Sequence, residues 1–230
     1  MMKEASVTMK DKYENDGFIV LPQIMKDIDS ETLMDEIINS VENGLEKTWE
    51  QRLRLQTLMI ETPEATKALK AIRRCVNLVV GENYKKSDTK LLREFASMTS
   101  YPGCEAQRWH RDQTKPDAVL MTAFMNLYET TLESGALQVI KASHKNIKWL
   151  ERINKDNIQT ISLPEKSLVI IDCRVIHRGG ANKTKKEIRP VLYASYGQGG
   201  LEEPGYFMHQ SMAGKYNLDE KEKEKSIKKN

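Results

Sequence analysis

The sequence has few cysteines, no long apolar run and almost no net charge, and each shortage excludes a class of protein. Its three cysteines, Cys75, Cys104 and Cys173, form no Cys-x-x-Cys pair, so the sequence predicts neither a disulfide framework nor a zinc knuckle. Purely apolar runs such as Leu168 to Ile171 are far too short to cross a bilayer. The net charge of +3 gives no sign of a nucleic-acid-binding surface.

Targeting signals are missing from the sequence as well. Met1 to Tyr13 contains no apolar segment of the kind found in secretory signal peptides, and the last three residues do not match a peroxisomal Ser-Lys-Leu address. The 39% of hydrophobic and 30% of charged residues are typical of an ordinary globular chain. We therefore expect a cytoplasmic protein that binds neither nucleic acid nor membrane, and the oligomeric state is left open.

The first part of the chain has helical periodicity. Residues 17–21 are a short apolar strand closed by Pro22, and a helix is predicted from about Ser30 to Leu45 because its apolar residues recur every three or four positions. A second helix is predicted from Thr62, which can cap it, to Gly81, which can end it. The charged stretch 46–60 is compatible with a loop or a helix over a binding site.

From residue 90 onward the sequence changes to short β-rich runs separated by turn residues, which is typical of an all-β sandwich or barrel. One short helix is expected at 146–157, where Ile147, Leu150 and Ile153 have helical spacing. The predicted strands are 91–101, 105–111, 117–128, 136–140, 159–162, 167–172 and 189–196.

These patterns predict a single domain over residues 1–217. Its helical N-terminal part covers about 8–85 and its barrel about 90–197. Residues 218–230 alternate in charge with almost no apolar anchor, and so read as a charged tail.

A candidate metal site begins at the tripeptide His110-Arg111-Asp112. Residues i and i+2 of a strand point to the same face, so the imidazole and the carboxylate can bind one cation together. The best third ligand is His177, which follows the buried-looking run ending at Asp172. Two imidazoles and one carboxylate suit iron(II) and leave three coordination positions free.

Those free positions suggest an oxygenase, since a 2-oxo acid can occupy two of them and dioxygen the third. The far carboxylate of a 2-oxo diacid needs a fixed cation, and the planar fork of arginine gives two parallel charge-assisted hydrogen bonds. Arg189 begins a predicted strand twelve residues after His177, and pairing would bring it alongside. The sequence therefore predicts 2-oxoglutarate as co-substrate.

Three blocks of sequence resemble the phytanoyl-CoA dioxygenase family of iron(II) and 2-oxoglutarate oxygenases. They are 102–113, 133–145 and 171–182, followed by Arg189, and the resemblance covers roughly residues 10–197. It implies a mainly β chain with flanking helices, folded as a double-stranded β-helix, which is a jelly-roll barrel like that of cupins. Lys141-Ala142 departs from the usual Pro-Gly of the second block, so the turn there must be built differently.

The first block looks most like the natural-product-pathway branch of that family. In this branch a glutamine three residues before the metal histidine contacts 2-oxoglutarate, which implies that role for Gln107. By strand parity Gln107 and His110 would face opposite ways, so a bend between them is required. Related halogenases replace the metal carboxylate with a small residue, whereas this chain retains Asp112.

The resulting hypothesis is a dioxygenase that uses Fe(II), 2-oxoglutarate and O2 to oxidise a C–H bond of a small organic molecule, releasing succinate and CO2. Two other interpretations stay open. One is a non-catalytic metal-binding β-barrel that acts as a sensor or binding protein. The other is a zinc hydrolase with the same three ligands.

Four further residues are weighed beside these. His144 and His209 read as structural and as surface or lid residues, respectively. Trp109 and Phe124 could wall the pocket, although an aromatic residue inside a barrel is more often core packing. The substrate-selecting walls are expected from the loops around 46–60, 113–117 and 198–214.

Overall fold

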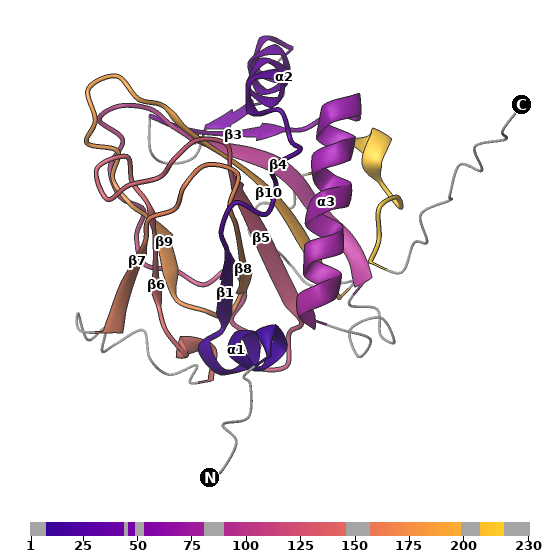
Figure 1. Cartoon of the computed structure of the whole chain (residues 1–230), viewed down its shortest axis with the longest axis vertical. Helices are drawn as coiled ribbons and strands as arrows, with labels where there is room; N and C mark the ends of the chain where they lie inside the picture. The colour runs from indigo at the N-terminus through magenta and orange to yellow at the C-terminus, as the bar shows by residue number, and fades with distance from the viewer. Residues whose placement is uncertain are drawn as a thin grey trace, which may run out of the picture.

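A computed structural model describes residues 8–43, 46–48, 53–80, 90–145, 157–198 and 208–218 (Figure 1). Its three α-helices are α1 (Met9–Asp16), α2 (Ser30–Glu42) and α3 (Pro63–Val80). The Asp29 carboxylate caps α2, and Thr62 Oγ1 accepts a hydrogen bond from Ala65 N at the start of α3. These starts confirm the two helices predicted from periodicity. No helix within the described ranges is long and apolar enough to cross a membrane.

Seven strands form the larger sheet, in the order β1-β8-β5-β10-β4-β3-β2, and every neighbouring pair is antiparallel. The central strands β4, β5, β8 and β10 match strands predicted from the sequence. The seven are β1 (Phe18–Leu21), β2 (Glu46–Thr48), β3 (Arg54–Leu58), β4 (Leu91–Ser100), β5 (Leu120–Asn126), β8 (Leu168–Asp172) and β10 (Arg189–Gly197).

A smaller antiparallel sheet has the order β7-β6-β9, with β6 at Leu137–Ile140, β7 at Ile158–Ile161 and β9 at His177–Gly179. Figure 1 shows it beside the larger sheet, on the side away from α3. Val139 and Ile161 of the smaller sheet pack with Val169 and Ile171 of the larger one in a shared apolar cluster. Two facing antiparallel sheets make the double-stranded β-helix that the resemblance implies.

The larger sheet separates an apolar core from the interior of the barrel. Leu192, Ala194 and Tyr196 of β10 are buried in the main core together with residues of α3, whereas Val191 and Tyr193 line the barrel cavity. This alternation follows from the period of two in a strand. The helices therefore cover one face, and the other is left for a site.

Two local predictions were wrong. Residues 105–111 do not form a strand, because their backbone groups bind scattered partners: Gln107 N donates to Gly179 O, and only His110 makes a β-bridge, to His177. Within the stretch 46–60, the described residues contribute β2 and β3 to the larger sheet rather than a loop or a helix, and Arg54 and Gln56 of β3 line the cavity.

The C-terminal segment 208–218 returns to the body of the protein. It includes a short 3₁₀ turn at Gln210–Met212, with a second such turn earlier in the chain at Ser143–Lys145. Leu218 is buried in the main core, and Asn77 Nδ2 of α3 donates to Leu218 O at 3.0 Å. Most of the predicted helix at 146–157 and the tail from 219 lie outside the described residues.

Candidate metal centre and co-substrate pocket

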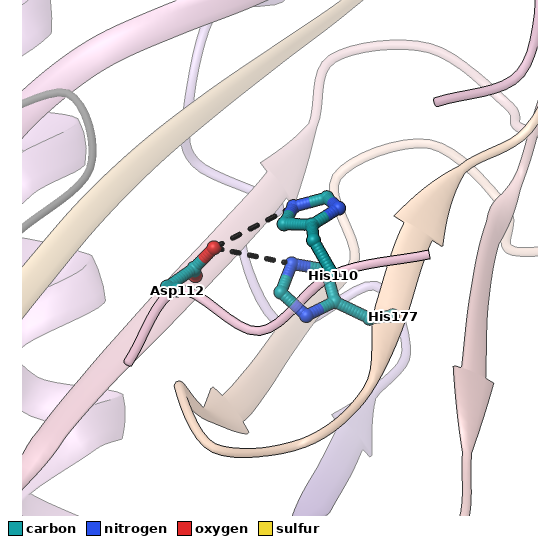
Figure 2. A group of neighbouring side chains, drawn as sticks. All are labelled: His110, Asp112 and His177. Atoms are coloured by element: carbon teal, nitrogen blue, oxygen red, sulfur yellow. Dashed lines mark ion pairs between the residues drawn. The ribbon is translucent and has the colours of Figure 1, made fainter. Parts of the chain in front are cut away.

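The three side chains predicted as metal ligands lie together (Figure 2), and all three line the barrel cavity. The backbones of His110 and His177 exchange two hydrogen bonds, of 3.1 and 2.9 Å, which fix the two residues side by side. Asp112 N donates to Cys173 O at 2.9 Å and so anchors the chain just beyond. The site thus depends on a single bridge and a bend rather than on the predicted strand.

The ligand atoms of the three residues converge on a small volume. Asp112 Oδ1 lies 3.6 Å from His110 Nε2 and 3.6 Å from His177 Nε2, and all three ligand atoms are within 4.8 Å of one another. Ligands at right angles around one ion, with bonds of about 2.1 Å, would be roughly 3 Å apart. A small adjustment of the side chains would therefore let one ion contact all three.

Both histidine rings are held in the tautomer that metal binding requires. His110 Nδ1 lies 2.8 Å from Arg108 O, and His177 Nδ1 lies 2.9 Å from Val175 O. A carbonyl oxygen can only accept, so each Nδ1 carries the proton and donates. Each Nε2 therefore presents its lone pair towards Asp112, in the arrangement typical of metal-bound imidazoles.

Burial favours the neutral form of the inner histidine, His177. Burial lowers the pKa of His177, the Asp112 carboxylate opposes this, and nearby His110 lowers it further. The side chain of His177 is only 5% exposed, compared with 36% for His110 and 23% for Asp112. The group is therefore closed on the His177 side and open on the other, so an ion could accept further ligands from the cavity.

The cavity between the two sheets has a volume of about 610 Å³. This lies in the range of small-molecule sites, which is roughly 300–1,000 Å³. Its apolar wall is formed by Phe124, Leu137, Ile161, Leu163, Val169 and Val191. Its polar residues include the three candidate ligands, Gln107 and four arginines, of which two, Arg54 and Arg189, lie beside Gly179.

Arg189 is one of the two arginines, and it is buried at the start of β10. Its Nη2 donates to Ser100 Oγ at 3.0 Å, while its Nε has no hydrogen-bond partner among the described residues. Burial lowers the pKa of Arg189 to about 9, and the charge of Arg54 contributes in the same direction. A buried donor without a partner is costly, so the site fits an anion.

The strand pairing that positions Arg189 differs from the one that the sequence predicted. Strand β10 pairs with β4 and β5 in the larger sheet, not with β9, which carries His177. Arg189 instead approaches β9 from across the barrel, where its Nη2 would lie 3.3 Å from a Cβ atom at Gly179. Strand pairing with β9, which the sequence analysis expected, therefore does not account for the position of Arg189.

Gly179 marks a small space where three polar side chains meet. A Cβ atom there would lie 2.5 Å from Arg54 Nη1 and 2.9 Å from Gln107 Oε1, besides Arg189 Nη2. Gln107 Oε1 accepts a hydrogen bond from Gly179 N at 2.8 Å, which leaves the amide nitrogen of Gln107 to donate to a ligand. The irregular backbone that the sequence required between Gln107 and His110 is present.

A comparison with protein families decides the classification. The model of the family described as Phytanoyl-CoA dioxygenase (PhyH) matches residues 13–191. The chain belongs to the phytanoyl-CoA dioxygenase family. Members are non-haem iron dioxygenases that use 2-oxoglutarate. The mixed nitrogen and oxygen donor set fits the iron, and the Nε of Arg189, which has no hydrogen-bond partner among the described residues, fits the 2-oxoglutarate.

Similar curated proteins of this family are fungal. The chain is 30% identical to dioxygenase easH of Epichloe festucae var. lolii over 108 residues, which are 42% of this chain and 57% of that protein. It is 30% identical to dioxygenase af480 of Aspergillus fumigatus over 119 residues, 47% of this chain and 38% of that protein. The chain thus spans less than two thirds of the length of either relative.

Solved structures share the fold of this phytanoyl-CoA dioxygenase family member. The epimerase SnoN, in complex with Fe3+, alpha ketoglutarate and nogalamycin RO, has a TM-score of 0.66 at 14% identity, covering 83% of this chain and 82% of SnoN. HygX from Streptomyces hygroscopicus, with nickel and 2-oxoglutarate bound, has a TM-score of 0.62 at 12% identity, covering 83% and 86%. At these identities the likeness concerns the fold.

His144 and His209 make structural contacts of their own, whereas the ring centre of Phe124 lies 6.4 Å from that of the candidate ligand His177. His144 Nε2 is 3.1 Å from Glu14 O, so it ties α1 to the 3₁₀ turn. His209 caps the C-terminal turn by accepting from Ser211 N. Phe124 lines the cavity, whereas Trp109 is covered by Arg178, whose guanidinium lies 4.5 Å from the ring centre.

Sequence reasoning missed Arg54, which is 1% exposed and lies in the wall of the pocket. Residues 54–58, Arg-Leu-Gln-Thr-Leu, do not alternate between polar and apolar side chains, so the sequence offered no clear strand signal there. Of the segments expected to select the substrate, 46–60 contributes to the wall through β3, no described residue of 113–117 lines the cavity, and 199–207 lies outside the described residues.

Proposed function

We propose that this protein is an Fe(II)- and 2-oxoglutarate-dependent dioxygenase that hydroxylates, or otherwise oxidises at a C–H bond, a small organic molecule. The observation that carries the proposal is one cavity lined both by His110, Asp112 and His177 and by Gln107 and the buried Arg189, whose Nε has no hydrogen-bond partner among the described residues. A metal site and an anion site that share one cavity suit a ligand with a chelating end and a carboxylate end.

Each residue has a distinct role in this proposal. His110, Asp112 and His177 would hold iron(II), with both Nε2 atoms already oriented by hydrogen bonds at Nδ1. Arg189 would bind the far carboxylate of 2-oxoglutarate, and Gln107 would donate an amide hydrogen bond to it. Together, bound iron(II), 2-oxoglutarate and O2 supply oxidation of a C–H bond, with succinate and CO2 as the co-products.

The substrate class follows from the wall of the cavity and from the relatives. Apolar side chains such as Phe124 and Leu163 favour a substrate with an apolar part, held beside the metal end. The fungal relatives are named dioxygenases, SnoN was solved with nogalamycin RO and HygX with hygromycin B. A small natural-product-like molecule is therefore the substrate we propose.

Residues 1–217 would form a single oxygenase domain in the cytoplasm, followed by a charged tail. The support for one domain is that β1, β2 and β3, from the predicted helical part, extend the same sheet as the barrel strands. The tail would begin slightly later than predicted, because Leu218 is part of the core.

Succinate release is the direct test. Iron(II)-loaded protein should convert 2-oxoglutarate to succinate in the presence of O2, slowly without a substrate and faster when a candidate molecule is added. Zinc-loaded protein should release no succinate. Hydrolysis of a candidate molecule by the zinc-loaded protein would instead favour a zinc hydrolase. Absence of 2-oxoglutarate binding in every metal state would sink the proposal.

A further inference from the structure

The turn between β8 and β9 contacts two of the three candidate metal ligands. Cys173 O accepts hydrogen bonds from Asp112 N at 2.9 Å and from the next backbone nitrogen at 3.1 Å. Val175 O lies 2.9 Å from His177 Nδ1 and accepts its proton. The turn at 172–175 therefore positions the carboxylate ligand through its backbone and the inner histidine through its ring.

An ion pair inside this turn fixes its shape. Arg174 donates from Nε to Asp172 Oδ1 at 2.9 Å and from Nη2 to Asp172 Oδ2 at 2.6 Å, so one guanidinium fork binds both carboxylate oxygens. Asp172 Oδ1 also accepts from Arg174 N at 2.9 Å. The side chain of Asp172 is only 8% exposed. Exposed ion pairs contribute little, but a bidentate pair with a buried partner is held far more firmly.

The same guanidinium also reaches the segment that follows Asp112. Arg174 Nη1 donates to Pro116 O at 2.5 Å, and Pro116 lies four residues after Asp112 in the sequence. Between them, Gln113 Oε1 accepts hydrogen bonds from the next two backbone nitrogens, which stiffens this short connection. Arg174 thus joins the turn that orients His177 to the segment that carries Asp112.

The spacing of two candidate ligands depends on how firmly these segments are joined. Asp112 Oδ1 and His177 Nε2 are 3.6 Å apart, close to the roughly 3 Å expected of two ligands around one ion. Ligands already held near their final spacing lose less freedom when the metal binds. We propose that Arg174, through its bonds to Asp172 and Pro116, is a positioning residue that maintains this spacing and so raises the affinity for the metal. This inference rests on the proposed function, which assigns both ligands to the metal.

The competing interpretation is that the ion pair only stabilises the fold. Its removal would then lower the free energy of unfolding, and the protein that remains folded would bind metal as before. The proposal instead requires a loss of metal affinity in folded protein. It also requires that turnover recovers once iron(II) is in excess, because Arg174 is not among the described residues that line the cavity.

The experiment titrates metal-free protein with cobalt(II), an air-stable substitute for iron(II), by calorimetry, and measures the urea unfolding of each variant alongside. Arg174→Met removes the fork and keeps an unbranched side chain. Asp172→Asn, the milder change, keeps an oxygen for Arg174 N and removes the charge, and it gives the same comparison should Arg174→Met fail to fold. Lys215→Met, which deletes an ion pair of 2.7 Å with Glu61 in other segments of the chain, is the matched control.

We expect Arg174→Met to weaken cobalt(II) binding by at least about tenfold and Asp172→Asn by a smaller factor, with the Kd of Lys215→Met unchanged. Saturating iron(II) should restore succinate formation by Arg174→Met to nearly the rate of the unaltered protein. An unchanged Kd in the folded variants, an equal loss in Lys215→Met, or turnover that does not recover would overturn the inference and leave the proposed function intact. If the unaltered protein binds no metal, or if the metal-loaded protein binds no 2-oxoglutarate, the proposed function fails instead.

Discussion

Leu192 and Tyr193 are neighbours in β10, and their side chains lie on opposite faces of the seven-stranded sheet. Leu192 is fully buried in the core beneath the helices, where all its neighbours in the cluster are hydrophobic. Tyr193 faces the cavity, where its hydroxyl group is hydrogen-bonded to Gln56 Nε2. One strand therefore contributes to stability with one face and to the site with the other.

The two faces of the sheet differ in the polar side chains that they bury. On the cavity face, Ser195 Oγ donates to Glu94 Oε2 at 2.6 Å and is 2.9 Å from Thr122 Oγ1. Such buried polar groups need partners, and a site built from them gains little from the hydrophobic effect. The helix-covered face must therefore supply most of the stability, and substitutions on the two faces should separate loss of function from loss of folding.

The largest effect is expected at Asp112, on the cavity side. Asp112→Ala removes the only acid of the three candidate ligands, and we expect succinate formation to fall by at least about a thousandfold, which is roughly 4 kcal/mol. The thermal unfolding of the metal-free protein should change little, because both histidines keep their backbone hydrogen bonds. Asp117→Ala, an exposed acid nearby, is the control. Succinate formation in Asp112→Ala at a rate close to that of the unaltered protein would contradict the assigned triad.

The next largest effect is expected on the helix-covered face. Leu192→Ala removes a fully buried side chain, which typically costs about 2–5 kcal/mol in the free energy of unfolding. Urea denaturation measures it, and the activity of the folded fraction should be close to normal. Leu132→Ala, at a side chain that is 56% exposed, should change stability little. A large loss of 2-oxoglutarate affinity in Leu192→Ala would break the separation between the faces.

The helix-covered face is also what the sequence predicted well. Apolar residues at helical spacing located α2 and α3, and the buried runs located β4, β5, β8 and β10, because hydrophobic periodicity reports directly on that core. β3 was missed because Arg54 and Gln56 point into the barrel, where a reader of the sequence expects apolar residues. An arginine in a charged stretch is usually solvated, and only tertiary structure reveals that this one is buried.

The three metal ligands could be predicted from the sequence for a different reason. His110 and Asp112 are two residues apart, so local geometry keeps them on one side even without a strand. The approach of Arg189 to Gly179 depends on how two sheets face each other, which no local pattern encodes. Chemistry that needs residues close in sequence can be predicted, whereas distances across a barrel follow from the fold.

A smaller effect is expected at Asn126, which tests whether every polar group on the cavity face serves the ligand. Asn126 lines the cavity, but its Nδ2 donates to Tyr128 O and Pro164 O, and its Oδ1 accepts from Ser167 N. Asn126→Ala should cost about 1–3 kcal/mol of stability, because three backbone groups lose a hydrogen bond, among them the N–H of the fully buried Ser167. The Kd for 2-oxoglutarate should stay within about twofold by calorimetry. A selective loss of 2-oxoglutarate binding would assign Asn126 to the co-substrate site instead.

The smallest effect is a pH dependence of the arginine end. The pKa of Arg189 is lowered to about 9 in the protein without ligand. A bound carboxylate favours the protonated form, so the Kd for 2-oxoglutarate should be constant below about pH 9 and rise up to tenfold per unit above it, about 1.4 kcal/mol. Folding responds with the opposite sign: the unfolded chain holds this proton more tightly, so stability rises with pH in the same window.

The metal site could produce a similar rise of the Kd with pH, because hydroxide competes with the ligand for the ion. Binding of 2-oxopentanoate separates the effect of the metal from the effect of Arg189. This acid binds through the same chelating atoms and has no far carboxylate, so its Kd should show only the contribution of the metal site. The ratio of the two Kd values then isolates the contribution of Arg189. A ratio that does not vary between pH 7 and pH 10.5 would mean that Arg189 stays fully charged there, and that burial perturbs the cavity face less than its contacts imply.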